Sequence, residues 1–202
     1  MKVARTVVIW ALLAAVIGVP FAAATASEQL AWRGPVYIIA GFAGIAALAL
    51  VLVQPLLIAG YLPGLSGYRG RRVHHWIGGS LVAAIVVHIA GLWITSPPDM
   101  IDAMTYTSPT PFSPFGVTAM WAIFAVALLA LVRRRLRLRT FRVVHLSLAV
   151  VIVAGSVVHA VLIEGTMETM SKAVLCVLVV AAAVKVMLDL WVRTRRVSPS
   201  GR

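Results

Sequence analysis

Six stretches of about 20 apolar residues, separated by short polar connections, recur along this 202-residue chain. A helix of that length spans the hydrocarbon core of a bilayer, which is about 30 Å thick. Inside lipid every backbone polar group needs a partner within the protein, and a helix supplies one for each group. The sequence therefore predicts an all-α integral membrane protein, a six-transmembrane-helix bundle. Its predicted spans are residues 6–26, 36–60, 75–95, 116–133, 143–163 and 172–192.

Basic residues are concentrated in alternate connections between these spans. The formal charge is +12, which in a soluble protein would suggest nucleic acid as a partner. In a chain that is 61% hydrophobic, the positive-inside rule accounts for the charge instead, and no nucleic acid partner is expected. Both termini and the arginine-rich connections are therefore predicted to be cytoplasmic, with the arginines at anionic lipid headgroups. The arginine-rich segments are residues 69–72, 133–142 and 193–202.

The first segment has two interpretations. It begins with basic residues, continues with an apolar core and ends in Ala-Thr-Ala, as a cleaved signal peptide does. Its apolar stretch is long for a signal peptide, so a retained first helix with its outer loop is favoured for residues 1–35. Residues 193–202 are predicted to form a basic cytoplasmic tail. The longest connection, residues 96–115, contains five prolines, which argue against regular helix.

All five histidines belong to the third and fifth predicted helices, and ionisable groups at membrane depth are costly unless partnered. Fourteen residues of helix turn through a net angle of about −40°. His74 and His88 therefore share one face, and so do His145 and His159. His75 would point nearly the other way, so His74 is favoured over it. Because the two helices run in the same direction, the first histidines meet near one membrane surface and the second near the other.

Two imidazoles at each depth favour haem over zinc. Zinc usually takes four protein ligands, or three and a water, and these helices offer no Cys, Asp or Glu at those depths. A porphyrin supplies four nitrogens and needs only two axial ligands. Two haems are therefore predicted, held by His74 with His145 and by His88 with His159, and helix packing by the histidines is the alternative. Without a C-x-x-C-H pattern the haems would be non-covalent, hence b-type.

Residues close to the histidines are predicted to complete the haem sites. Arg71, Arg72 and Arg142 would meet propionates of the inner haem as charge-assisted partners. Small residues near the histidines would leave room for the flat macrocycle. These small residues are Gly78, Ala84, Gly91, Ala149 and Gly155.

Four further charges lie in or beside the last two spans. Lys185 and Asp189 are four residues apart on the sixth helix, and an ion pair is predicted, with a propionate contact or a quinol site as alternatives. Glu164 and Glu168 would lie just outside the outer haem, where they would bias partner docking or the haem potential, or serve as solvated loop residues.

The stretches HHWIGG…H and FRVVHLSLAV…H resemble the motifs HRxLG…H and W-x-x-L-H-x-L-x-Y…H of the ferric-reductase-type transmembrane domain. That family includes the membrane part of NADPH oxidases, ferric reductases, and the haem subunit of the periplasmic methionine sulfoxide reductase system. The resemblance covers residues 36–192 and implies a bundle that carries electrons across the membrane through two stacked b-type haems. It places His74 at the first ligand position. The usual aromatic residue after the fifth-helix histidine is replaced by the apolar run Leu148–Ala149–Val150.

The same resemblance implies a short, stand-alone bacterial member that is multi-pass in the inner membrane. The chain lacks G-x-G-x-x-G, and no flavin or nicotinamide module is expected in it. The electron donor would be a flavoprotein or a quinol on the cytoplasmic side, and the acceptor ferric iron or a periplasmic reductase. The sequence contains no recognisable catalytic residue, so an oxidoreductase activity would depend on a partner protein. A haem-free transporter or proton path, or an assembly subunit, is the alternative function.

Overall fold

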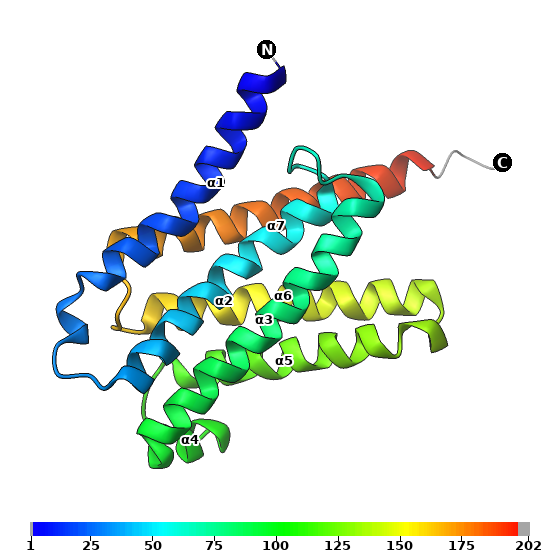
Figure 1. The fold of residues 1–202 in the computed structure, drawn as a ribbon. Coiled ribbons are helices and arrows are strands. Elements are labelled where there is room, and N and C mark those ends of the chain that lie inside the picture. The colour runs from blue at the N-terminus through cyan, green and yellow to red at the C-terminus, as the bar shows by residue number, and fades with distance from the viewer. Residues whose placement is uncertain (1, 198–202) are drawn as a thin grey trace.

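The computed structural model describes residues 2–197, and the side chains of residues 3–192. Within that part the chain is helical and contains no strand. Figure 1 shows the arrangement of the helices. The α-helices are α1 (Lys2–Thr25), α2 (Pro35–Ala59), α3 (Gly67–Thr95), α4 (Pro97–Met104), α5 (Ser113–Leu131), α6 (Leu138–Leu162) and α7 (Thr169–Val197), and the 3-10 turns are η1 (Glu28–Leu30) and η2 (Arg133–Arg135).

Six of these helices are long and apolar enough to cross a membrane, which confirms the predicted fold class. They are α1, α2, α3, α5, α6 and α7, so the histidine-bearing third and fifth spans are α3 and α6. The predicted basic tail lies largely beyond the described part of the chain. Of its residues, 198–202 are not described, and neither are the side chains of 193–197.

The two histidine helices pack on different neighbours. Helix α3 packs along α2 and α6 along α5, whereas α3 and α6 make little direct contact with each other. Helix α7 lies against both α2 and α6, and α1 touches α2 and α7 while its N-terminal end projects away from the bundle (Figure 1). The helix packing thus leaves the facing sides of α3 and α6 apart, with other helices closing the space around them.

The main buried core draws apolar side chains from α2, α3, α5, α6 and α7. Leu52, Ile123 and Val179 are each at most 4% exposed there, and the thiol of Cys176 is buried beside them. Large apolar side chains on the outer faces of the same helices, such as Leu128 and Leu188, are exposed. Apolar side chains therefore occupy both the interior and the outer surface, which suits a protein whose outer surface contacts lipid rather than water.

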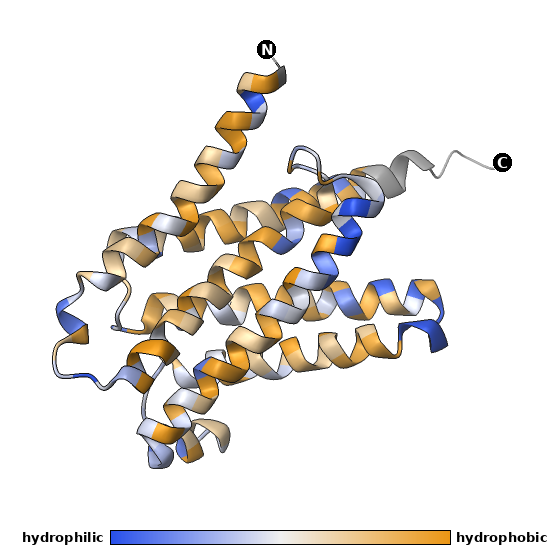
Figure 2. Cartoon of the chain, in the orientation of Figure 1, coloured by the Kyte–Doolittle hydropathy of each residue, from blue (hydrophilic) through white to orange (hydrophobic). Residues whose placement is uncertain are grey.

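The two ends of the bundle differ in polarity. Figure 2 shows hydrophilic residues gathered at the end formed by η2 and the start of α3, which we call the inner end. The opposite, outer end is formed by η1, α4 and the segment 163–168. At the inner end the chain turns from α2 to α3 through Gly60, Gly64 and Gly67, which all have positive φ angles of 60–80°. The cytoplasmic location of the inner end remains a prediction.

Two sequence-based boundaries differ from the structure. Helix α3 begins at Gly67 rather than near residue 75, because Arg71 and Arg72 continue the helix beyond the apolar stretch that hydropathy detects. The prediction that prolines keep residues 96–115 free of regular helix was wrong for α4. Pro97 and Pro98 occupy the first turn of that helix, where the missing N–H has no helical partner to lose.

Candidate functional site

The outer pair of histidines is held by backbone carbonyls. Nδ1 of His88 lies 2.7 Å from the carbonyl oxygen of Ala40 on α2, and Nδ1 of His159 lies 3.0 Å from that of Phe112, at the start of α5. A carbonyl oxygen only accepts, so in both rings Nδ1 is the protonated donor. In the neutral ring Nε2 then carries the lone pair. Metal-ligating histidines are typically fixed in this way by their second nitrogen.

A glycine lies beneath each of these two rings. Gly44 follows Ala40 by one helical turn, and Gly116 follows Phe112 by the same interval. A Cβ at position 44 would come within 3.0 Å of the His88 ring, and one at position 116 within 2.5 Å of Nδ1 of His159. A contact of 2.5 Å is essentially excluded and one of 3.0 Å is unusually tight, so each glycine gives the imidazole the space to reach its carbonyl.

His88 and His159 line one cavity of about 450 Å³. This volume falls within the range of about 300–1,000 Å³ that small-molecule and cofactor sites occupy. The wall between the two rings is mostly apolar and includes several small residues, which suits a flat hydrophobic group. The small residues on the wall are Gly41, Gly44, Ala47, Gly116, Ala119 and Ala160.

The inner pair of histidines is also brought together. The ring centroids of His74 and His145 are 6.2 Å apart, and the ring of Phe141 stacks on His145 at 5.5 Å. One metal between two imidazole nitrogens, each bonded at about 2 Å, places the ring centres about 6 Å apart. The separation therefore fits two axial ligands of one iron. Nδ1 of both rings is buried without a hydrogen-bond partner, so fewer protein contacts fix these rings than the outer ones.

Gln54 on α2 lies beside His74 of the inner pair, as Ala40 lies beside His88 of the outer pair. It follows Ala40 by fourteen residues, as His74 precedes His88 by fourteen, and the two helices run antiparallel. Its backbone lies beside His74. Its side-chain Oε1 is itself buried and unpartnered, and its Nε2 lies 3.2 Å from where a Cβ of Gly78 would be. Gln54 is thus the polar neighbour of the inner site that sequence reasoning missed.

The other predicted site residues are more peripheral. His75 is exposed, and its ring contact is with His74 at 6.2 Å rather than with α6. The assignment of His74 rather than His75 as the axial ligand stays a prediction. Arg72 and Arg142 lie on the second turns of α3 and α6 with exposed side chains at the inner end, near their respective histidines in sequence.

Two of the glycines expected to leave room for a macrocycle, Gly91 and Gly155, lie at close contacts between helices. A Cβ at Gly91 would lie 2.7 Å from Cβ of Ala40, and one at Gly155 would lie 2.9 Å from the Phe115 carbonyl oxygen. Gly78 faces Gln54, as described above. Sequence spacing could not distinguish these roles, because it shows which face of a helix carries a glycine but not which helix that face meets. The only sequence signal for the role of Gly44 and Gly116 was that each is a glycine within an apolar helix.

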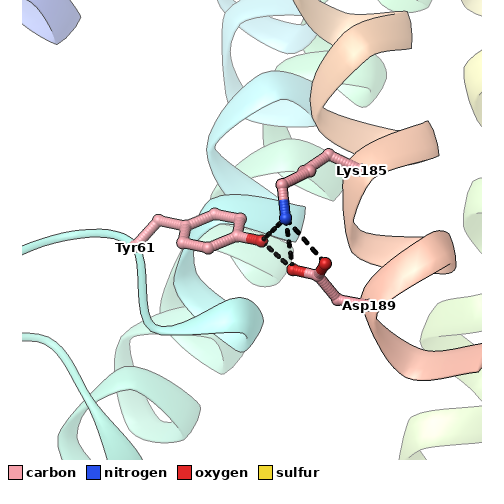
Figure 3. Close-up of polar contacts among 3 residues, drawn as sticks. All are labelled: Tyr61, Lys185 and Asp189. Atoms are coloured by element: carbon pink, nitrogen blue, oxygen red, sulfur yellow. Dashed lines mark hydrogen bonds and ion pairs between the residues drawn. The ribbon is translucent and has the colours of Figure 1, made fainter. Parts of the chain in front are cut away.

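The predicted ion pair on the last helix is confirmed and has a third member. Nζ of Lys185 lies 2.6 Å from Oδ1 of Asp189, and the hydroxyl of Tyr61 hydrogen-bonds Asp189 as well (Figure 3). Lys185 Nζ also donates to the Tyr61 hydroxyl at 3.1 Å. Tyr61 follows the end of α2, so the cluster ties that end to α7. It was missed because Tyr61 is 124 residues away from Lys185 in the chain.

Glu168 has a local role at the start of α7. Its carboxylate accepts the backbone amides of Met170 and Ser171, both at 2.6 Å, as a helix N-cap. These bonds, that from Ser171 first, hold the pKa of the Glu168 carboxyl below its usual range. The carboxylate is therefore bound by the start of the helix, a role that none of the sequence-based interpretations had assigned.

No group of three or more His, Cys, Asp or Glu side chains comes together as a metal site within the described part of the chain. The donors that do converge are the two pairs of imidazoles, one near each end of α3 and α6. This donor set fits a metal whose remaining ligands come from a macrocycle.

Comparison with known proteins gives one match. No curated protein and no solved structure matches the chain. A family model described as "Ferric reductase like transmembrane component" matches residues 40–156, which is more than half of the chain. The matched region begins at Ala40, whose carbonyl oxygen accepts from His88, and contains three of the four paired histidines, His74, His88 and His145. The chain belongs to the family of ferric reductase-like transmembrane components.

Proposed function

We propose that this protein carries electrons across the membrane through two non-covalent b-type haems. His74 and His145 would be the axial ligands of the inner haem, and His88 and His159 those of the outer one. The observation that carries the proposal is the outer cavity, where two imidazoles each bind a backbone carbonyl through Nδ1 and so keep Nε2 for a metal. Membership in the ferric reductase-like family supports the same function.

Each part of the site has a role in this function. A bound haem supplies a one-electron couple whose potential depends on its axial ligands and burial. The chain orients the ligands through Ala40 and Phe112, and the apolar wall of the cavity excludes water. Fourteen residues of helix separate the inner from the outer ligands by about 21 Å along the helix axis. Two sites at that spacing would let electrons cross most of the bilayer without movement of the protein.

The charges at the two ends suit different partners. The arginine-rich inner end favours an acidic flavoprotein, or a quinol near the headgroups, as electron donor. At the outer end the exposed side chains of Asp99 and Asp102 border the cavity and favour a cationic or metal-bearing acceptor. Ferric iron and a periplasmic reductase are the acceptors we propose, in a bacterial inner membrane.

The first experiment measures haem directly. A reduced-minus-oxidised spectrum and a pyridine-haem assay on the purified protein should give two haems b per chain, extractable with acid-acetone. His88→Ala and His159→Ala should each remove the outer haem and retain most of the inner one, and His145→Ala should do the converse. A protein without porphyrin absorbance would refute the proposal and favour a haem-free transporter or assembly subunit.

The second experiment tests the exit of electrons. In right-side-out vesicles, a membrane-impermeant ferric chelate should re-oxidise the dithionite-reduced protein. The His159→Ala variant should be re-oxidised much more slowly, because its outer haem is missing. Equal rates for the two proteins would show that the outer site is not the exit.

A further inference from the structure

A lysine is buried in the wall of the outer cavity. Lys172, in the first turn of α7, is 8% exposed and lines the same cavity as His88 and His159. Its Nζ makes one hydrogen bond, to the carbonyl oxygen of Ile163 at 2.8 Å. An ammonium group has three N–H donors. Two of them therefore have no protein acceptor in the arrangement described.

No carboxylate balances this charge. Within residues 3–192 the structure has no Asp or Glu oxygen within 4 Å of Lys172, since the ion pair found there is Lys185–Asp189. Glu168 is one turn earlier in sequence, but its two oxygens accept backbone amides of α7, and Lys172 is the weakest influence on it. Burying a cation without a partner is costly, so such groups are nearly always paired.

The surroundings of Lys172 indicate what kind of anion would complete the cavity. The walls are largely apolar and hold two imidazoles, and Lys172 contributes the basic side chain. Asp99 and Asp102 also line the cavity, but both are exposed and come from α4. An occupant that fits these walls is flat and apolar, binds metal between the imidazoles, and carries a carboxylate that reaches α7.

We propose that Lys172 binds a propionate carboxylate of the outer haem. The inference rests on the proposed bis-haem function and adds a residue of the outer site that pairs with the cofactor's charge. A charge-assisted contact of this kind neutralises the propionate and so favours the reduced iron. Lys172 would thereby raise the midpoint potential of the outer haem and leave the inner haem unaffected.

The test is a redox titration of Lys172→Met and Lys172→Arg, followed through the haem absorbance. His145→Ala, which keeps only the outer haem, assigns the outer transition. Lys172→Met should shift that transition to lower potential, whereas Lys172→Arg should stay near wild type. Lys185→Met is the matched control, because it removes a lysine of the same helix outside the cavity, and it should leave the outer transition in place. An unchanged outer potential in Lys172→Met would overturn the proposal.

A second arm separates a haem propionate from a free carboxylate in the same cavity. Apoprotein reconstituted with haem dimethyl ester, whose propionates are uncharged, should give the same outer potential for wild type and Lys172→Met. A difference that persists with the ester would show that the lysine binds another anion, and would overturn the assignment to propionate. A protein that binds neither haem nor its ester would instead refute the proposed bis-haem function.

Discussion

Gly116 on α5 lies directly against the imidazole of His159 on α6. A Cβ at position 116 would come within 2.5 Å of Nδ1, the atom that donates to the carbonyl of Phe112 one turn earlier on α5. The same relation joins Gly44 to His88, with Ala40 supplying the carbonyl. The two outer histidines are thus each positioned by a carbonyl and by the absence of a side chain four residues later.

Gly116→Ala should therefore displace the His159 ring and lower the outer haem content. The added methyl group has no space unless the ring gives up its hydrogen bond to Phe112. Haem per polypeptide, measured by the pyridine-haem assay, should fall from two towards one. Gly79→Ala is the control, because nothing lies within 4 Å of a Cβ at that position of α3. It should keep both haems and stabilise the helix by up to about 1 kcal/mol.

His74→Ala and His75→Ala should differ in their effect on the inner haem. The His74 ring faces His145 at 6.2 Å, whereas His75 is exposed. Loss of His74 should remove the inner haem, as loss of His145 does, and loss of His75 should leave most of it. The reverse result, seen as retention of the inner absorbance in His74→Ala, would show that His75 is the ligand.

Removal of Lys185 should weaken the connection between the end of α2 and α7. Lys185→Met removes the hydrogen bonds that Nζ donates to the Asp189 carboxylate and to the Tyr61 hydroxyl. Because the Lys185 side chain is 59% exposed, the loss of stability should be small. Thermal unfolding in detergent should place the Tm of Lys185→Met slightly below that of wild type. A large fall in Tm would contradict this expectation.

The N-cap at Glu168 should make the start of α7 sensitive to acid. Since the folded-state pKa is lowered from the usual 4.5, this stabilisation is complete above that value and is lost as pH falls through the folded pKa. The Tm of wild type should exceed that of Glu168→Ala at neutral pH, and the gap should close on acidification. A gap that stays constant as the pH falls would contradict the proposed role of this carboxylate as a cap.

The sequence by itself determined the fold class and which histidines share a face. Apolar runs of spanning length predict helices because no other single segment satisfies its own backbone in lipid. The 14-residue spacing places His74 with His88, and His145 with His159, because helix geometry is fixed. These predictions concern periodicity within one segment. The helix starts were less accurate, since Arg71 and Arg72 extend α3 without adding hydropathy.

Only the tertiary structure decided which groups surround each histidine. The carbonyls of Ala40 and Phe112 carry no sequence signal, because every residue has a backbone carbonyl and contact depends on how two helices pack. For the same reason, glycines that look alike in the sequence have different neighbours in the structure. Gly44 and Gly116 lie beneath imidazoles, whereas Gly91 and Gly155 lie at contacts between helices. Lys172 lies in the first turn of α7, and only the packing of that helix against its neighbours buries its side chain in the wall of the outer cavity.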